Sequence, residues 1–283
     1  MRERVAAAGA EELAALITAK RDWMIVTISL RKWAASAFQS AMTRLKRGRK
    51  TVKRTIVYID GYNLYYGRLR GTEFKWLDVV KLCVSILAQQ DPASRIVAVR
   101  FFTAPALGKF ASHGNASVSA QQQYHRALTA VNEGILNIVL GSHSFNKSGI
   151  HAYAFLPGRV FDKTQKRHVW KIEEKQTDVN IALRAYRDAS KGLADQVVFV
   201  TNDSDIEPAM KAIKEDFPRV YIGSIMPIAP VASPAGHQRR ASVSLSNLAN
   251  WTRHSISDGE LASAQLPTAI ATAKRPIVKP THW

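Results

Sequence analysis

Four aspartates stand where strands end or helices begin, and such positions could bring their carboxylates together. Asp60 ends a short run rich in β-branched residues, and Asp203 and Asp205 follow a second apolar run. Asp178 stands at the start of a helical pattern. Carboxylates a few ångströms apart repel one another, so they must take up protons or a cation. Oxygen ligands without cysteines or paired histidines favour Mg²⁺ or Mn²⁺ over zinc, and these ions suit phosphodiester hydrolysis.

Each of these acids also has an ordinary structural explanation. An acid in the first turn of a helix offsets the helix dipole, and Thr177 is the expected N-cap ahead of Asp178. Asp60 before a glycine suits a turn after a strand. Ser204 and Glu207 have the spacing of a capping box. For one residue alone the structural explanation is favoured, whereas the combination of four favours a shared site.

The elements that must position these acids alternate between strand and helix from residue 55 onward. Short apolar runs predict strands, and apolar residues three and four positions apart predict helices. The predicted strands are 55–60, 95–103, 135–140, 196–201 and 219–223, and the predicted helices are 76–90, 118–133, 177–190 and 204–215. Alternating strands and helices form parallel sheets, which bind ligands beyond the carboxyl ends of their strands. We therefore predict an α/β fold of three layers, with a central, mostly parallel sheet flanked by helices.

Three parts are predicted along the chain. Residues 1–53 form a basic N-terminal extension, partly helical or disordered, which could alternatively be an arm for RNA or a membrane surface. Residues 54–226 form the α/β domain, in which 141–171 is irregular and is interpreted as a loop or hairpin excursion. Residues 227–283 are rich in Pro, Ser and Ala, and we expect a short helix around 244–251 with a tail that packs on the domain or stays mobile.

The composition restricts the partners and the compartment. The net charge is +18, half of it within residues 1–54, which favours a polyanionic partner such as nucleic acid, an anionic membrane face or an acidic protein. The longest early apolar run, Trp23–Leu30, is too short to span a bilayer, so no membrane span is expected. Cys83 is the single cysteine, so no disulfide forms within the chain and a cytoplasmic location is expected. The sequence leaves the oligomeric state open, a homodimer included.

Three segments resemble the motifs of NYN-domain proteins of the LabA-like, PIN-like nuclease type. They are YIDGYNLYY at Tyr58–Tyr66, EEKQTDVNIA at Glu173–Ala182 and VFVTNDSDIEPAM at Val198–Met210. The stretches Gln265–Pro267 and Lys279–Trp283 also resemble the ending of LabA-like bacterial members. The resemblance begins near residue 54 and does not cover residues 1–50. Asn202 and Thr177 depart from the Gly and Val that many relatives carry, but neither change removes a carboxylate.

This resemblance implies a PIN-like fold and a Mg²⁺- or Mn²⁺-dependent ribonuclease with RNA as its partner. Asp60, Asp178, Asp203 and Asp205 match the metal-binding and catalytic aspartates. Asn63 matches a polar residue for phosphate or water positioning. The residues themselves add that Tyr62, Tyr65 and Tyr66, beside Arg68 and Arg70, could stack on bases, although part of this cluster is expected to pack in the core. Lys175 is expected to contact a phosphate or, equally, to pair with a nearby glutamate. The predicted substrate-binding residues are Tyr62, Asn63, Lys175, Asn202 and Ser204.

Two alternative functions stay open at this point. A non-catalytic RNA-binding regulatory protein could keep the acidic pocket, and the basic extension favours that interpretation. A phosphatase of the haloacid dehalogenase type also uses aspartates at strand ends. It needs a second aspartate two positions after the nucleophile, where this chain has Tyr62. Dinucleotide and P-loop binding are disfavoured because neither glycine-rich motif is present.

Overall fold

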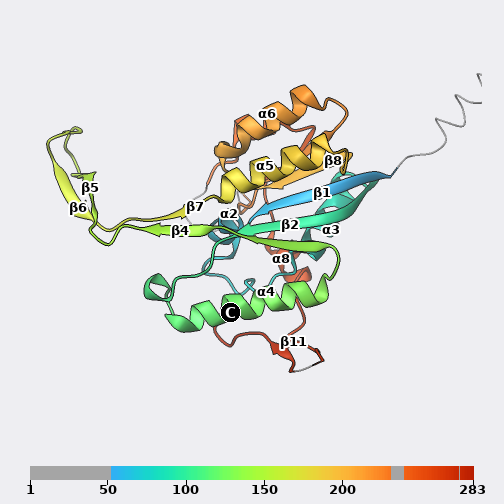
Figure 1. Cartoon of the computed structure of the whole chain (residues 1–283), viewed down its shortest axis with the longest axis horizontal. Helices are drawn as coiled ribbons and strands as arrows, with labels where there is room; N and C mark the ends of the chain where they lie inside the picture. Colours follow the sequence, from blue (N-terminus) through green and yellow to red (C-terminus); the bar gives the residue numbers. More distant parts are fainter. Residues whose placement is uncertain (1–51, 231–238, 274) are drawn as a thin grey trace, which may run out of the picture. The chain divides into compact units, whose positions relative to one another are not determined.

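A six-stranded parallel sheet organises the computed structural model, which describes residues 52–230, 239–273 and 275–283 (Figure 1). Its strands lie in the order β10-β9-β8-β1-β2-β3. They are β1 (Lys53–Asp60), β2 (Ser94–Thr103), β3 (Leu136–Leu140), β8 (Gln196–Val200), β9 (Tyr221–Ile225) and β10 (Trp251–Arg253). The predicted N-terminal extension lies outside the described residues, apart from its last two positions.

Helices cover both faces of this sheet and complete three layers (Figure 1). One face carries α3 (Val79–Gln90), α4 (Asn115–Val131) and α8 (Asp258–Ser263), and the other carries α5 (Thr177–Ser190), α6 (Glu207–Asp216) and α7 (Val243–Leu248). Alternate residues of β1 enter the two cores: Val57 and Ile59 enter the first, and Ile56 and Tyr58 enter the second. A strand that is apolar on both sides suits a sheet covered on both faces, so the predicted three-layer α/β fold is confirmed.

The chain order places a crevice at the centre of the sheet. From β1 the chain adds β2 and β3 on one side, and it later adds β8, β9 and β10 on the other. At such a switch point the connections after the two central strands leave in opposite directions, and a ligand can enter between them. Asp60 ends β1, and Thr201 follows β8 directly beside it. The first and third acidic motifs, with Asp60 and Asp203, therefore lie at this switch point.

The long predicted elements agree with the structure, whereas several short ones were missed. The predicted helix 177–190 has the same bounds as α5, and the other long elements differ from the prediction by one to three residues at most ends. Two helical turns after β1 were not predicted, namely α2 (Gly61–Leu64) and the π-helix Tyr65–Leu69. The strand β10 was not predicted either, because three residues are too few to show a periodicity and form a strand only by pairing with β9.

Residues 142–175 form an arm that leads away from the sheet (Figure 1). Near the domain, β4 (Ser142–Phe145) pairs antiparallel with β7 (Ile172–Lys175), and further out β5 (Ile150–Tyr153) pairs with β6 (Lys166–Val169). The excursion predicted for 141–171 as a loop or hairpin is thus a hairpin. We call residues 142–175 the arm below.

The C-terminal part of the chain packs against the face formed by α3 and α4. After α8 come the short strands β11 (Ala269–Ile270) and β12 (Ile277–Val278), which pair with each other. The ring of Trp283 lies 5.3 Å from that of Tyr124 and 6.3 Å from that of Trp76. Two short 3-10 turns complete the described elements, Gly108–Phe110 and Ser204–Ile206. Among the described helices, none has the length and apolar character that crossing a membrane requires.

Candidate active site

Asp60 is held at the switch point by hydrogen bonds to both of its carboxylate oxygens. Oδ1 accepts from the backbone N–H of Asn63 at 2.9 Å, and Oδ2 accepts from the hydroxyl of Thr201 at 3.1 Å. The side chain thereby caps α2 and is 5% exposed. Burial raises the pKa of Asp60 to about 6, and the charges of Asp178 and Asp203 add to the rise. Asp60 is therefore a buried carboxyl that holds its proton to a higher pH than a solvent-exposed aspartate does.

The glycine after Asp60 is required by close packing rather than by a turn. A Cβ on Gly61 would lie 2.7 Å from the carbonyl oxygen of Phe102 and 2.9 Å from the ring of Phe101. Gly61 begins α2, so the chain turns directly into a helix that packs against β2. The Asp-Gly pair thus allows the carboxylate to sit at the strand end while the next turn packs tightly against the sheet.

Asp203 and Asp205 lie on the neighbouring strand end, after β8. The backbone N–H of Asp203 donates to the Thr201 hydroxyl at 3.1 Å, and its carboxylate accepts from the Asp205 N–H at 3.0 Å. Asp203 therefore caps the 3-10 turn Ser204–Ile206, and the predicted Ser204 capping box is wrong. The cause is the extra 3-10 turn ahead of α6. It leaves Glu207 at the start of α6, where it pairs with Lys211 at 2.6 Å.

Asp178 lies in the first turn of α5, as predicted, but Thr177 is not the N-cap. The cap is Gln176, whose left-handed backbone (φ 76°) turns the chain from the arm into the helix. Partial burial raises the pKa of Asp178, followed by the charges of Asp203 and Asp205. The second and third acidic motifs thus lie close enough to influence each other.

Glu174 is a fifth acid beside these aspartates, and it was not among the predicted site residues. Its carboxylate accepts a hydrogen bond from the Thr177 hydroxyl. Burial raises the pKa of Glu174 to about 7, and the charges of Asp60 and Asp178 contribute to the rise. Successive residues of a strand point to opposite sides, so Glu173 faces away and pairs with Lys175 at 2.6 Å. No sequence pattern at 172–175 separates these two glutamates, because the pairing of β7 with β4 decides which of them faces the site.

Among the described residues, these five carboxylates have no cationic side chain to neutralise them. Within the described part of the chain, no Lys, Arg or His lies at ion-pair distance from any of them. They are hard oxygen donors, and their mutual repulsion fits an added divalent cation. As they stand, the described residues hold no group of three or more His, Cys, Asp or Glu side chains arranged to hold a metal ion. The four-aspartate metal set therefore stays a prediction.

Some of the predicted substrate-binding residues hold the loops in position, and others face solvent. The Asn63 amide oxygen accepts from the Asn202 backbone N–H at 3.0 Å, which ties the two strand ends together. The Asn202 side chain in turn holds the segment near residue 241, because it donates to the Arg240 carbonyl and accepts from the Ser242 N–H. Ser204 is exposed in the 3-10 turn. Lys175 forms the glutamate pair that the sequence left open as its alternative.

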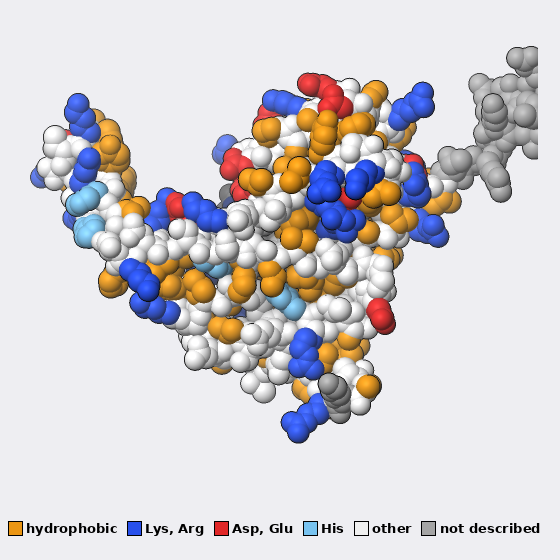
Figure 2. All heavy atoms as spheres, viewed as in Figure 1, with side chains coloured by type: hydrophobic (Ala, Val, Ile, Leu, Met, Phe, Trp, Pro, Cys, Tyr) orange, Lys and Arg blue, Asp and Glu red, His pale blue; other side chains and the backbone are white. Residues whose placement is uncertain are grey.

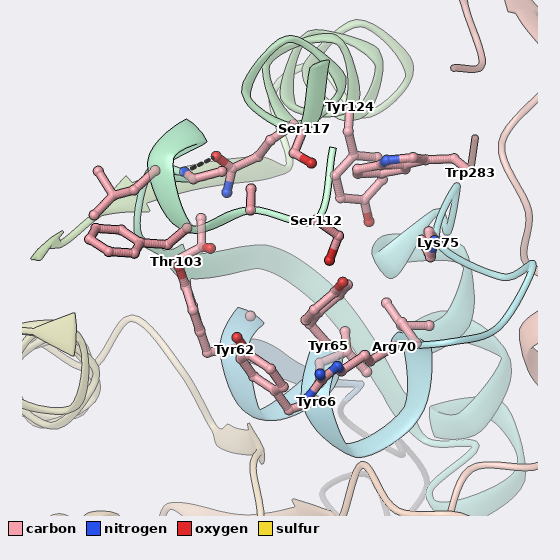
Figure 3. A pocket seen from close by; sticks show the side chains of 18 of the residues that line it. Tyr62, Tyr65, Tyr66, Arg70, Lys75, Thr103, Ser112, Ser117, Tyr124 and Trp283 are labelled. Carbon is pink, nitrogen blue, oxygen red and sulfur yellow. Dashed lines mark hydrogen bonds between the residues drawn. The ribbon is translucent and has the colours of Figure 1, made fainter. Parts of the chain in front are cut away.

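Tyr62, two residues after Asp60, lines a cavity of about 830 Å³ beside the acidic site. Its hydroxyl lies 3.0 Å from His143 Nε2 on the arm. The cavity lining includes Tyr62, Tyr65, Tyr66, Tyr124, Trp283, Arg70 and Lys75, several of which Figure 3 shows facing one another. Glu174 lines the same cavity, so it belongs to both the acidic site and the cavity wall.

Comparisons with known proteins give one family and two individual similarities. The family described as NYN domain matches residues 54–242. The chain is 39% identical over 243 residues to a protein of Pseudomonas putida named 6-hydroxy-3-succinoylpyridine 3-monooxygenase HspA; the match covers 81% of this chain and 75% of that one. A crystal structure of a protein of unknown function from Vibrio parahaemolyticus is similar with a TM-score of 0.43 at 15% identity. That match covers 74% of this chain and 96% of the other.

Proposed function

This chain belongs to the NYN domain family, which is typical of PIN-like nucleases, and from this premise we propose that it is a metal-dependent ribonuclease. The proposed site residues are Asp60, Asp178, Asp203 and Asp205, joined by Glu174, and the proposed cofactor is Mg²⁺ or Mn²⁺. The observation that carries the proposal is the gathering of uncompensated carboxylates at the switch point of a parallel sheet. The single cysteine Cys83 is free and buried, and we place the activity in the cytoplasm.

In the proposed hydrolysis, the side chains of the site have different roles. The carboxylates of the site would hold a divalent cation, which would act there as a Lewis acid and lower the pKa of water. Asp60 is fixed by two hydrogen bonds, so it offers a ligand that needs little reorganisation. Glu174 lies between the carboxylates and the cavity, where it can accept the proton that the attacking water loses. Each cut consumes one water: its oxygen bonds to phosphorus, the bridging P–O bond breaks, and the leaving oxygen takes a proton from solvent.

The arm supports RNA as the partner. Its outer part exposes large apolar side chains to solvent: Phe155 is 89% exposed, Phe161 71% and Trp170 75%. Six Lys or Arg and one Asp lie between residues 146 and 171, and Figure 2 shows basic and apolar side chains intermixed along this arm. Exposed rings can stack on unpaired bases while cations contact phosphates. An arm of this composition therefore suits single-stranded RNA.

Replacing Lys163 and Arg167 by Gln is expected to weaken single-stranded RNA binding and to reduce its dependence on salt. Each lost phosphate contact should reduce the slope of log K against log salt by about 0.7, so the double variant should lose about 1.4. Both side chains are exposed on the arm, so the fold should not change. Fluorescence anisotropy with a labelled oligonucleotide, in EDTA and over a range of salt, measures the slope. An unchanged slope would remove the arm from the RNA-binding surface.

The similarity to the Pseudomonas putida protein favours a second candidate function. That protein is named a monooxygenase of a substituted pyridine, and the aromatic cavity beside Glu174 has room for a small aromatic ring. In this alternative the chain hydroxylates such a ring with O₂ and a two-electron donor such as a reduced nicotinamide. One oxygen atom enters the ring, the other leaves as water, and the donor is oxidised.

Two assays on the same preparation separate these functions. For a ribonuclease we expect RNA shortening with Mn²⁺ that EDTA abolishes, and no O₂ uptake with a hydroxypyridine and reduced nicotinamide. O₂ uptake that depends on the pyridine, without RNA cleavage, would replace the ribonuclease with the monooxygenase. RNA binding without cleavage, together with no Mn²⁺ binding by calorimetry, would identify the non-catalytic RNA-binding alternative.

A further inference from the structure

We propose that the cavity beside Glu174 binds a planar aromatic ring that carries an anionic group. The ring would lie among the tyrosine and tryptophan side chains, and the anion would meet Arg70 and Lys75. The inference names the ligand class of the site proposed above, and it rests on that proposal for how the ligand meets the carboxylates. Such a ligand could be a nucleotide of an RNA strand or a free aromatic carboxylate, since both present the same chemistry.

The walls of the cavity are built from aromatic rings on two sides (Figure 3). On one side, the Tyr66 ring lies 5.2 Å from that of Tyr65 and 5.8 Å from that of Tyr62. On the other side, the Tyr124 and Trp283 rings lie 5.3 Å apart. The two sides come from the turns after β1 and from α4 with the C-terminal segment, so the tertiary structure alone brings them together. Facing rings of this kind hold a flat ring by stacking and edge contacts.

The Tyr65 and Tyr66 side chains are accessible to a ligand rather than buried in the core. They are 37% and 46% exposed, and their hydroxyls have no hydrogen-bond partner among the described residues. By contrast, the Tyr124 hydroxyl donates to the Leu77 carbonyl at 2.6 Å, which anchors the opposite wall. One wall is thus fixed by the core, and the other offers free phenol groups to whatever enters.

Two cations line the cavity without an acidic partner. The Arg70 guanidinium lies 5.5 Å from the centre of the Tyr66 ring, and the Lys75 ammonium lies 3.5 Å from the His282 carbonyl. No described carboxylate comes within ion-pair distance of either cation. A guanidinium over an aromatic ring remains free to bind an anion in its own plane. These cations are therefore available to a phosphate or carboxylate of the ligand.

The charges on the cavity wall give a ligand one orientation. Glu174 brings negative charge from the acidic site, whereas Arg70 and Lys75 provide the positive charge. When the anionic group of the ligand contacts Arg70 and Lys75, it is kept away from the carboxylates, and the rest of the ligand points toward Glu174. The volume of about 830 Å³ lies within the usual range of small-molecule sites, roughly 300–1,000 Å³. A cavity of this volume can hold a mononucleotide or a pyridine carboxylate.

Calorimetry on the full chain in EDTA tests this site without any metal-dependent reaction. The probes are adenosine 5′-monophosphate and pyridine-3-carboxylate, with adenosine and pyridine as their neutral counterparts. At least one anionic probe should bind about tenfold or more tightly than its neutral counterpart, which is the effect of one charge-assisted contact. The tighter of the two anionic probes identifies the source of the ligand. Equal binding of anionic and neutral probes, or no binding of any probe, would overturn the proposal.

Variants separate the cavity from the rest of the surface. Arg70→Gln with Lys75→Gln should weaken the anionic probe about tenfold or more and leave the neutral one unchanged. Ser112→Glu, which adds a carboxylate at an exposed position of the lining, should have the same effect without removing a cation. The control variant Arg187→Gln with Arg219→Gln, which removes two exposed cations outside the cavity lining, should bind the probe like the wild type. Normal probe binding in both cavity variants would sink the proposal. RNA cleavage can fail while probe binding persists, so this failure is distinguishable from failure of the ribonuclease proposal.

Discussion

Asp203→Asn should lower the rate of Mn²⁺-dependent RNA cleavage by about a hundredfold or more while the fold stays intact. The substitution removes one negative charge from the proposed ligand set, and about 3 kcal/mol of lost transition-state stabilisation gives that factor. The asparagine oxygen can still accept the Asp205 N–H, so the cap of the 3-10 turn is kept. Initial rates on a labelled oligonucleotide at several Mn²⁺ concentrations measure the effect, and calorimetry measures Mn²⁺ affinity alongside.

A matched control for Asp203→Asn is Asp216→Asn. Asp216 ends α6 and accepts a hydrogen bond from Tyr186, exposed to solvent and outside the acidic site. The Asp216→Asn variant should keep the full cleavage rate. Asp60→Asn should behave like Asp203→Asn, because Asp60 lies on the neighbouring strand end. Full activity in both site variants would refute the ribonuclease proposal. Lost activity with unchanged Mn²⁺ affinity would instead assign these aspartates a role other than metal binding.

Mn²⁺ affinity should fall steeply as the pH is lowered from about 8 to about 5. The pKa of Glu174 is raised to about 7 and that of Asp60 to about 6, so both carboxyls become protonated across this interval. A cation must displace these protons, which costs up to about tenfold in affinity per pH unit and proton. Calorimetric titrations at four or five pH values measure the slope. A flat profile between pH 8 and pH 5 would show that neither group meets the metal.

The raised pKa of Asp60 also makes the metal-free fold less stable at high pH. The folded state holds the proton more tightly than the unfolded chain, whose pKa is near 3.8. This contribution to stability is fully present below that value and is lost as the pH rises through about 6. The shift corresponds to at most about 3 kcal/mol at pH 8. Asp60→Asn removes the buried charge, so the inactive variant should be about 1–3 kcal/mol more stable than the wild type in EDTA.

Urea unfolding at pH 5 and pH 8 measures this difference, with and without Mn²⁺. The gain from Asp60→Asn should appear at pH 8 and shrink toward pH 5, where wild-type Asp60 holds its proton. Saturating Mn²⁺ should stabilise the wild type and leave the variant nearly unchanged, because only the wild type binds the ion tightly. If Asp60→Asn is instead less stable at pH 8 in EDTA, then the hydrogen bonds from Asn63 and Thr201 outweigh the cost of burying the charge.

The fold class and the acidic motifs could be predicted from the sequence because they depend on local patterns. Apolar runs and helical spacing extend over many residues in α5 and β8, so their bounds were predicted closely. A carboxylate at a strand end is equally local, and Asp60 and Asp203 lie beyond the carboxyl ends of β1 and β8 as expected, whereas only the strand order shows that these ends form the switch point. The same reasoning predicted the hairpin excursion but could not give its pairing, because register depends on the partner strand.

The rest of the site depends on contacts between residues far apart in the chain. Glu174 acquires its raised pKa only when β7 brings it beside Asp60 and α5, and burial is a property of the folded molecule. Asn63 and Asn202 are 139 positions apart, and their hydrogen bond shows that they position the strand ends. The cavity needs Tyr66 from the turn after β1 and Trp283 from the C-terminal segment, and no periodicity predicts that two distant rings will face one cavity. The amino-acid sequence alone therefore determined which chemical groups are present and which elements carry them, whereas tertiary packing decided which groups meet and with what charge.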